Sequence, residues 1–217
     1  MRINIFSYSK ESLHEEVVAR VVNTPPPIVD GKAFIEKEYV LYAKIANIAI
    51  LDKAESFCLQ EQWEVKVPKM FDNFTSGRIR VRKTTSGDKI NYVLATKIKV
   101  SEGNKEIEIM ASEDMFNQFK LIATTGMNKK RYIFPIENSI LKWEVDVFIT
   151  PDGDTSEWVK IDLEVLEPIP KLPQLPPGFT NVISNQGSNQ TDEEKRKIQD
   201  LYNTVFLRKN EHLDSQT

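Results

Sequence analysis

The stretch Arg78-Ile79-Arg80-Val81-Arg82 carries an arginine at every second position and an apolar residue at each position between. In a β-strand, side chains two residues apart point to the same face of the sheet. The stretch therefore predicts a strand with one arginine face and one apolar face. Three like charges in one row repel each other, so an anion or a row of carboxylates is expected to face them.

The same period of two recurs along the chain and predicts about eight strands. They are expected over residues 34–41, 62–67, 78–83, 92–100, 106–110, 132–136, 143–148 and 158–166. Five of these strands carry charged pairs of one sign on one face: Glu36 with Glu38, Lys97 with Lys99, Glu106 with Glu108, Glu144 with Asp146, and Asp162 with Glu164.

Charge is sorted along the sequence, although the total is close to neutral. The 217 residues hold 29 basic and 32 acidic side chains, for a net charge of −3. Residues 66–99 hold nine basic and two acidic side chains, whereas residues 134–168 hold two basic and nine acidic ones. The near-neutral total argues against a general nucleic-acid binder. The sorting indicates that a basic group of strands faces an acidic one.

Helices are expected in three places. Residues 42–54 are rich in alanine and isoleucine, and residues 112–123 begin with a serine cap and two acidic residues. Thr191 and Glu194 form a capping box, and the apolar residues that follow have helical spacing. The chain should thus end in an amphipathic helix that docks on the rest of the protein.

The length and composition indicate one main domain in a reducing compartment. We expect an N-terminal extension over 1–30, one domain over 31–210 that includes a proline-rich strap and the C-terminal helix, and a tail over 211–217. No apolar run is long enough to span a membrane, and the first residues do not resemble a secretory signal. The single cysteine, Cys58, excludes an intrachain disulfide. A cytoplasmic protein is therefore predicted.

The strands predict an α+β fold, an eight-stranded antiparallel closed β-barrel with helices packed outside. In such a barrel the charged faces line a tunnel and the apolar faces meet the helices. The alternative is an ordinary sheet whose charged face is in water. In the tunnel, arginines and lysines suit phosphate oxygens, and carboxylate pairs suit Mg²⁺ or Mn²⁺. The two walls together describe a polyphosphate site.

In order and spacing, these strands resemble the CYTH superfamily, which comprises the triphosphate tunnel metalloenzymes, thiamine triphosphatase and class IV adenylate cyclases. Residues 78–82 resemble the family's Arg-x-Arg strand, 92–99 the strand with its phosphate-binding lysine, and 105–108 its basic-Glu-x-Glu strand. Residues 129–132 are similar to its Lys-x-Arg element, and 144–148 and 161–164 to its last two acidic strands. The resemblance runs from about Phe34 to the C-terminal helix.

The first strand departs from the family pattern. The family has Glu-x-Glu-x-Lys there, whereas this chain reads Glu36-Lys37-Glu38-Tyr39-Val40. If Glu36 and Glu38 are aligned with the two glutamates of the family, Val40 stands where lysine is expected. If the alignment is shifted by two residues, Phe34 stands in place of the first glutamate and Glu38 in place of the lysine. Either register leaves the same side chains facing inward.

The resemblance implies a role for each charged set. The triphosphate would be held by Arg78, Arg80, Arg82, Lys97, Lys99, Lys129 and Arg131. One or two Mg²⁺ or Mn²⁺ ions would be held by Glu36, Glu38, Asp162 and Glu164. Basic side chains or an attacking water would be positioned by Glu106, Glu108 and Asp146.

Three functions follow from the resemblance. The first is a metal-dependent triphosphatase that hydrolyses a nucleoside or other small-molecule triphosphate. The second is a non-catalytic module that binds or sequesters a nucleotide or phosphorylated signal, which the valine at position 40 favours. The third is a class IV adenylate cyclase. A 5′-triphosphate end of RNA is a less favoured substrate, and no membrane partner is expected.

Overall fold

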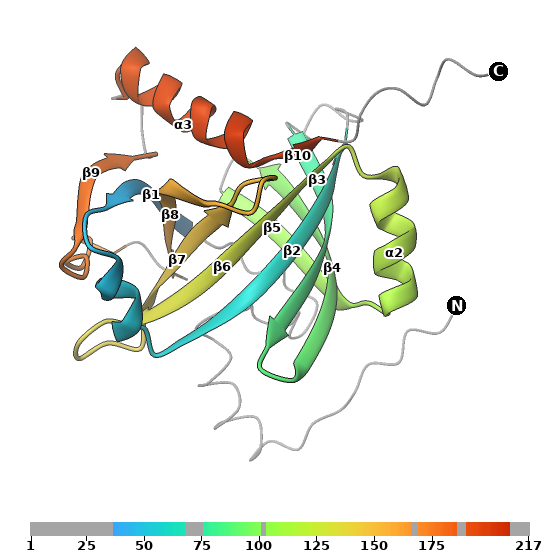
Figure 1. The fold of residues 1–217 in the computed structure, drawn as a ribbon, viewed down its shortest axis with the longest axis horizontal. Coiled ribbons are helices and arrows are strands. Elements are labelled where there is room, and N and C mark those ends of the chain that lie inside the picture. Colours follow the sequence, from blue (N-terminus) through green and yellow to red (C-terminus); the bar gives the residue numbers. More distant parts are fainter. Residues whose placement is uncertain (1–36, 68–75, 101–102, 166–168, 186–189, 209–217) are drawn as a thin grey trace.

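The computed structural model describes residues 37–67, 76–100, 103–165, 169–185 and 190–208 (Figure 1). The predicted extension over 1–30 and the tail over 211–217 lie outside these residues. The elements are β1 (Lys37–Ile45), η1 (Ile48–Lys53), β2 (Ser56–Val67), β3 (Ser76–Ser86), β4 (Lys89–Val100), β5 (Gly103–Met110), α2 (Glu113–Ile122), β6 (Thr125–Pro135), β7 (Lys142–Ile149), β8 (Thr155–Val165), β9 (Phe179–Ser184), α3 (Asp192–Val205) and β10 (Leu207–Arg208).

One large antiparallel sheet dominates the structure, which confirms the predicted α+β class. Its hydrogen-bonded order is β5-β4-β3-β2-β6-β7-β8-β1-β9, and β10 pairs with β6 off this path. The long strands β2 and β6 are neighbours, with α2 and α3 at different sides of the sheet (Figure 1).

The predicted eight-stranded closed barrel is wrong in both strand number and closure. The path has nine strands, and in the described residues it ends at β5 on one side and at β9 on the other. The reason lies at β1, whose two edges are occupied by β8 and by β9. The ninth strand, Phe179–Ser184, follows the proline-rich strap and was not expected. Because β9 covers the outer edge of β1, that edge is not available to β5.

The register places the charged positions of the strands on one face, as the alternation predicts. Arg80 lies opposite Glu64 of β2 and Ala95 of β4, and Arg131 of β6 lies opposite Asp146 of β7. Directly opposed residues share a face. The sheet curls around this charged face, which is concave, and the apolar positions form the convex face.

The convex face is covered in two places. Helix α2 places Phe116 against Trp63 and Val81 of the sheet. Over β1, β7 and β8 the cover consists of η1 and the proline-rich strap, and the Trp143 Nε1 donates a hydrogen bond of 3.3 Å to the strap carbonyl of Gln174. The strap is therefore a packed connection between β8 and the C-terminal part of the chain.

Helix α3 contradicts the prediction that all helices pack outside. Its buried residues Leu201 and Val205 belong to a cluster with Tyr42, Met127 and Phe148, which are concave-face positions. The predicted capping box at its start is confirmed, because the Thr191 side chain accepts from the Glu194 amide and the Glu194 carboxylate accepts from the Thr191 amide. The amphipathic helix thus covers one end of the concave face.

The helix predicted over residues 42–54 is wrong. Strand β1 continues to Ile45, and only residues 48–53 form a short 3₁₀ helix. Tyr42 and Ala43 are buried on opposite faces of the sheet, so burial on both sides overrides the helical propensity of the alanines. Among the described residues, no helix has the length and hydropathy needed to cross a bilayer.

Candidate functional site

The concave face encloses a cavity of about 770 Å³ lined by charged side chains from eight strands. Its basic lining residues are Arg78, Arg80, Arg82, Lys97, Lys129, Arg131 and Lys160, and its acidic ones are Glu38, Glu64, Glu108, Asp146, Asp162 and Glu164. Helix α3 contributes Tyr202 and Phe206 to the same cavity. The charges nearly balance in number, but they are arranged by strand into two walls.

The wall formed by β3 and β4 is basic. The Arg82 Nη2 donates a hydrogen bond of 3.1 Å to Glu108 of β5, whereas Arg80 lies 3.9 Å from the same carboxylate. Arg78 lies 3.7 Å from Glu64 and its side chain is 55% exposed. The distance from Arg78 to Glu64 exceeds hydrogen-bond length, so an oxyanion in the cavity can compete for the Arg78 guanidinium group.

On the opposite wall, Asp146 of β7 holds two basic side chains of β6. Arg131 donates to its two carboxylate oxygens over 2.7 and 2.8 Å, and Lys129 also contacts this carboxylate. Arg131 also contacts Glu144 and lies 3.9 Å from Asp162. Arg131 is thus fixed among three carboxylates, which orients it rigidly toward the cavity.

Glu38 of β1 joins the two walls. One of its oxygens accepts a hydrogen bond of 3.0 Å from Lys97 of β4, and the other accepts one of 3.1 Å from Lys160 of β8. Lys160 also donates to Asp162 over 2.5 Å. Nearby, the hydroxyl groups of Tyr42 and Tyr202 are 2.7 Å apart and tie α3 to this part of the cavity.

Burial and neighbouring charges shift the pKa values of these groups in different directions. Burial tends to raise the pKa of Glu38, but Lys160 and Lys97 outweigh it and hold that pKa well below the usual range. Burial raises the pKa of Glu144 to about 8, aided by nearby carboxylates and opposed by Arg131. Burial, with the neighbouring Arg131, lowers the pKa of Lys129 to about 8. Lys129, which lines the cavity, and Glu144, which contacts Arg131 beside it, therefore both change charge slightly above neutral pH.

The acidic wall provides oxygen atoms suited to a divalent cation. The Asp162 Oδ1 is buried without a hydrogen-bond partner, and the Glu164 carboxylate makes no hydrogen bond or ion pair with the described residues. No three acidic, histidine or cysteine side chains among the described residues come together as a complete metal cage. Mg²⁺ is commonly held by one or two carboxylates, water and substrate phosphates, so the two carboxylates fit a metal that arrives with a phosphate ligand.

Most of the predicted site residues meet in this cavity. It brings together Arg78, Arg80, Arg82, Lys97, Lys129, Arg131, Glu38, Glu108, Asp146, Asp162 and Glu164. Glu36 lies outside the described residues, and the structure describes Lys99 in β4 and Glu106 in β5 through their backbone alone. The positions of those three side chains remain predictions.

The cavity also contains polar residues that the sequence did not predict, among them Lys160, Glu64 and Tyr202. Lys160 has the same two-residue spacing from Asp162 as Asp162 has from Glu164, so the alternation could have found it. Glu64 likewise faces the cavity within an expected strand. Tyr202 had no sequence signal, because its place depends on how α3 docks.

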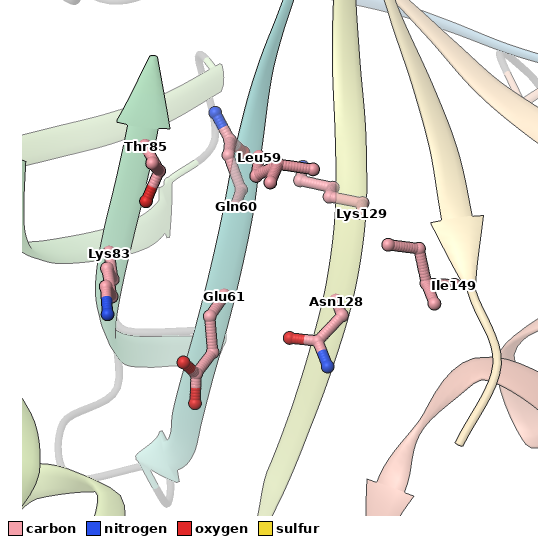
Figure 2. Close-up of a pocket in the computed structure, with 8 residues that line it drawn as sticks. All are labelled: Leu59, Gln60, Glu61, Lys83, Thr85, Asn128, Lys129 and Ile149. Carbon is pink, nitrogen blue, oxygen red and sulfur yellow. The ribbon is translucent and has the colours of Figure 1, made fainter. Parts of the chain in front are cut away.

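A second, smaller hollow of about 250 Å³ lies over β2, β3, β6 and β7. Figure 2 shows its lining, which includes the side chains of Leu59, Glu61, Lys83, Thr85 and Asn128. By register, these five positions belong to the convex face. Their carboxylate, ammonium and amide groups do not form two charged walls, so the concave cavity is the stronger candidate site.

Comparison with known proteins found solved structures that are similar to this chain, but no match by sequence. No protein-family model matches the chain, and no curated protein matches it. The PH1819 protein from Pyrococcus horikoshii OT3 is similar over 80% of this chain and 95% of its own, at 15% identity and a TM-score of 0.41. The putative adenylyl cyclase HpAC1 from Hippeastrum, reported with a dominant triphosphatase activity, is similar over 60% of this chain and 80% of its own, at 14% identity and a TM-score of 0.39.

At these TM-scores, the chemistry of the cavity has to be derived from its own side chains.

Proposed function

We propose that the concave cavity binds the triphosphate group of a nucleotide or another small molecule and hydrolyses it with Mg²⁺ or Mn²⁺. The observation that carries this proposal is the pair of facing walls, with Arg78, Arg80 and Arg82 in one row opposite the acidic strands β7, β8 and β1. A ligand that suits both walls is anionic and also brings a cation.

A chain of phosphates fits the basic wall better than a single phosphate. Side chains two residues apart on a strand are separated by about 6.7 Å, so the three arginines of β3 form a row about 13 Å long. Lys97 and Arg131 approach the cavity from other strands. Guanidinium groups bind phosphate oxygens through paired donors, and lysines add point charges. We assign Lys99 and Lys129 to the same role.

The size of the cavity favours a small molecule over an RNA end. Its volume of about 770 Å³ is within the range of ordinary small-molecule sites. A nucleoside triphosphate, thiamine triphosphate or tripolyphosphate is therefore the substrate class that we propose.

The acidic wall is assigned to the metal. Asp162 and Glu164, with Glu38 and Glu36 of the first strand, would hold one or two ions together with phosphate oxygens. When bound, such an ion withdraws charge from the phosphates and so favours attack on the phosphorus. The arginines neutralise the remaining phosphate charge as it develops during transfer.

Three further carboxylates are assigned to positioning. Asp146 holds Lys129 and Arg131, and Glu108 holds Arg82, so both fix basic side chains in the direction of the phosphates. We assign Glu106 to the same group, which orients either basic side chains or the attacking water. Restricting these long side chains before the substrate arrives lowers the entropy cost of binding the reacting geometry.

A non-catalytic binding module is the second candidate. Val40 lines the cavity as an apolar residue at the position where the resemblance has lysine. If that lysine is needed for turnover, the cavity would bind a triphosphate without cleaving it. An adenylate cyclase would use the same cradle and direct a ribose 3′-hydroxyl at the α-phosphate.

One panel of assays separates these functions. The purified protein with Mg²⁺ or Mn²⁺ should release phosphate from ATP, thiamine triphosphate or tripolyphosphate, and Arg80→Ala and Glu38→Ala should abolish the release. Lys44→Ala is the matched control, because Lys44 pairs with the exposed Glu157 outside the cavity. Tight binding without turnover across the panel would refute hydrolysis and support the binding module, and formation of cyclic AMP with pyrophosphate would support the cyclase.

A further inference from the structure

The ammonium group of Lys160 lies between two carboxylates that the proposed function assigns to a metal. It donates to Glu38 of β1 over 3.1 Å and to Asp162 of its own strand over 2.5 Å. The side chain is 20% exposed and points into the cavity. A positive charge that belongs to the chain therefore occupies a place where a divalent cation would bind carboxylate oxygens.

We propose that Lys160 is a displaceable internal counter-ion, which holds Glu38 and Asp162 in the metal-free cavity and competes with a divalent cation for the Asp162 carboxylate. The inference rests on the proposed function for the identity of the anion that enters the cavity. It concerns positioning and metal affinity, and it assigns no reacting group.

Competition follows from the geometry at Asp162. One of its oxygens, Oδ2, is occupied by Lys160, whereas Oδ1 is buried without a hydrogen-bond partner. A cation on this carboxylate would approach the ammonium group within a few ångströms, and two like charges at such a distance in a buried site repel strongly. The cation can therefore bind tightly only if the Lys160 ammonium group leaves Asp162. If Lys160 stays on Asp162, the affinity for the cation is lower.

A triphosphate offers Lys160 another partner. Lysine has a long, flexible side chain with three donors, so its ammonium group can turn from a carboxylate to a phosphate oxygen within the same cavity. Metal binding would then be weak without the anion and stronger with it. Because linkage is reciprocal, the metal would strengthen anion binding by the same factor.

The test measures Mn²⁺ binding without any nucleotide, by calorimetry and by the electron paramagnetic resonance of the free ion. Lys160→Gln should bind Mn²⁺ at least about tenfold more tightly than the wild type, since it removes the competing charge and leaves two carboxylates facing each other. Lys160→Arg, which keeps the charge, should remain close to the wild type. Unchanged or weaker Mn²⁺ binding in Lys160→Gln would overturn the proposal.

Two control variants separate local competition from a general change in charge. Lys97→Gln removes the same charge from Glu38 without touching Asp162, and should raise Mn²⁺ affinity less than Lys160→Gln. Lys44→Gln removes a charge outside the cavity and should leave the affinity unchanged. Equal gains in Lys160→Gln and Lys97→Gln would refute a specific role for Lys160.

A measurement on the wild type covers the case in which Lys160→Gln does not fold. The ¹⁵N resonance of the Lys160 ammonium group, assigned with Lys160→Arg, should shift when Mg²⁺ and tripolyphosphate are added together. A resonance that stays in place would contradict the displacement. Neither test depends on turnover, so absent phosphate release combined with a gain of Mn²⁺ affinity would refute hydrolysis and leave the competition at Asp162 standing.

Discussion

Lys97 and Glu38 are joined by a hydrogen bond of 3.0 Å, although β3, β2, β6, β7 and β8 lie between their strands in the sheet order. Two strands so distant in one sheet can approach each other this closely only if the sheet curls. The cavity is therefore bridged on this side by an ion pair between side chains. The charged groups on both walls are held close enough to act on one ligand.

The first prediction concerns this bridge. Lys97→Met and Glu38→Gln should each lower the free energy of unfolding by about 1–3 kcal/mol, and the double variant should lose less than the sum of the two. A double-mutant cycle by urea denaturation measures the coupling. The exposed pair Lys44 and Glu157 is the control and should show a coupling below about 1 kcal/mol. Additive losses for Lys97 and Glu38 would contradict a bridging role.

The second prediction concerns Arg131. Arg131→Met should lower the free energy of unfolding by about 3–5 kcal/mol, because it leaves buried carboxylates without their counter-ion. Arg131→Lys should lose less, since it keeps the charge and gives up the two-point contact with Asp146. Urea denaturation checks both variants, with the exposed Arg196→Met expected to remain within about 0.5 kcal/mol of the wild type. A loss in Arg131→Met as small as in this control would show that Arg131 does not hold the acidic wall together.

The third prediction concerns pH. The pKa of Lys129 is lowered to about 8, so its ammonium group loses its proton as the pH rises through that value. The pKa of Glu144 is raised to about 8, so its carboxyl group becomes anionic over the same range. Both changes make the cavity less positive. The affinity for tripolyphosphate should therefore fall between pH 7 and 9, by up to about tenfold per pH unit for each linked proton.

Calorimetry at several pH values measures this fall, and buffers of different ionisation enthalpy should reveal proton uptake on binding. Lys129→Arg keeps its charge throughout and should show a shallower dependence on pH. An affinity that is constant from pH 7 to 9 in the wild type would contradict the assignment of Lys129 to the anion.

The fourth prediction concerns Gly126 of β6. A Cβ atom at this position would lie 2.6 Å from the Cε3 atom of Trp63, which is buried under α2. Gly126→Ala should therefore lower the free energy of unfolding by about 1–3 kcal/mol. Thermal and urea unfolding check this, with the exposed Ser86→Ala as a control. Trp63→Leu combined with Gly126→Ala should lose less than the two single losses together, and full additivity would show that the ring is not the obstacle.

The sequence predicted the faces of the strands better than their connections. Arg78, Arg80 and Arg82 face the cavity as their spacing indicates, because alternation is a local property of an extended chain. The capping box at Thr191 is equally local and was found for the same reason. The helix over 42–54 failed, because the burial of Tyr42 and Ala43 on the two faces of β1 depends on distant elements.

The sequence by itself determined that one face of the sheet is charged, that its charges are sorted by strand, and that an amphipathic helix ends the domain. The tertiary structure alone decided that β9 occupies the edge of β1, that α3 docks on the concave face, and that Lys97 and Lys160, from two other strands, both hold Glu38. The physical reason is the distance along the sequence between the residues that interact. Alternation and capping depend on neighbours along the chain, whereas sheet order, curvature and ion pairing depend on residues far apart in sequence, such as Lys160 and Glu38, which are separated by 122 positions.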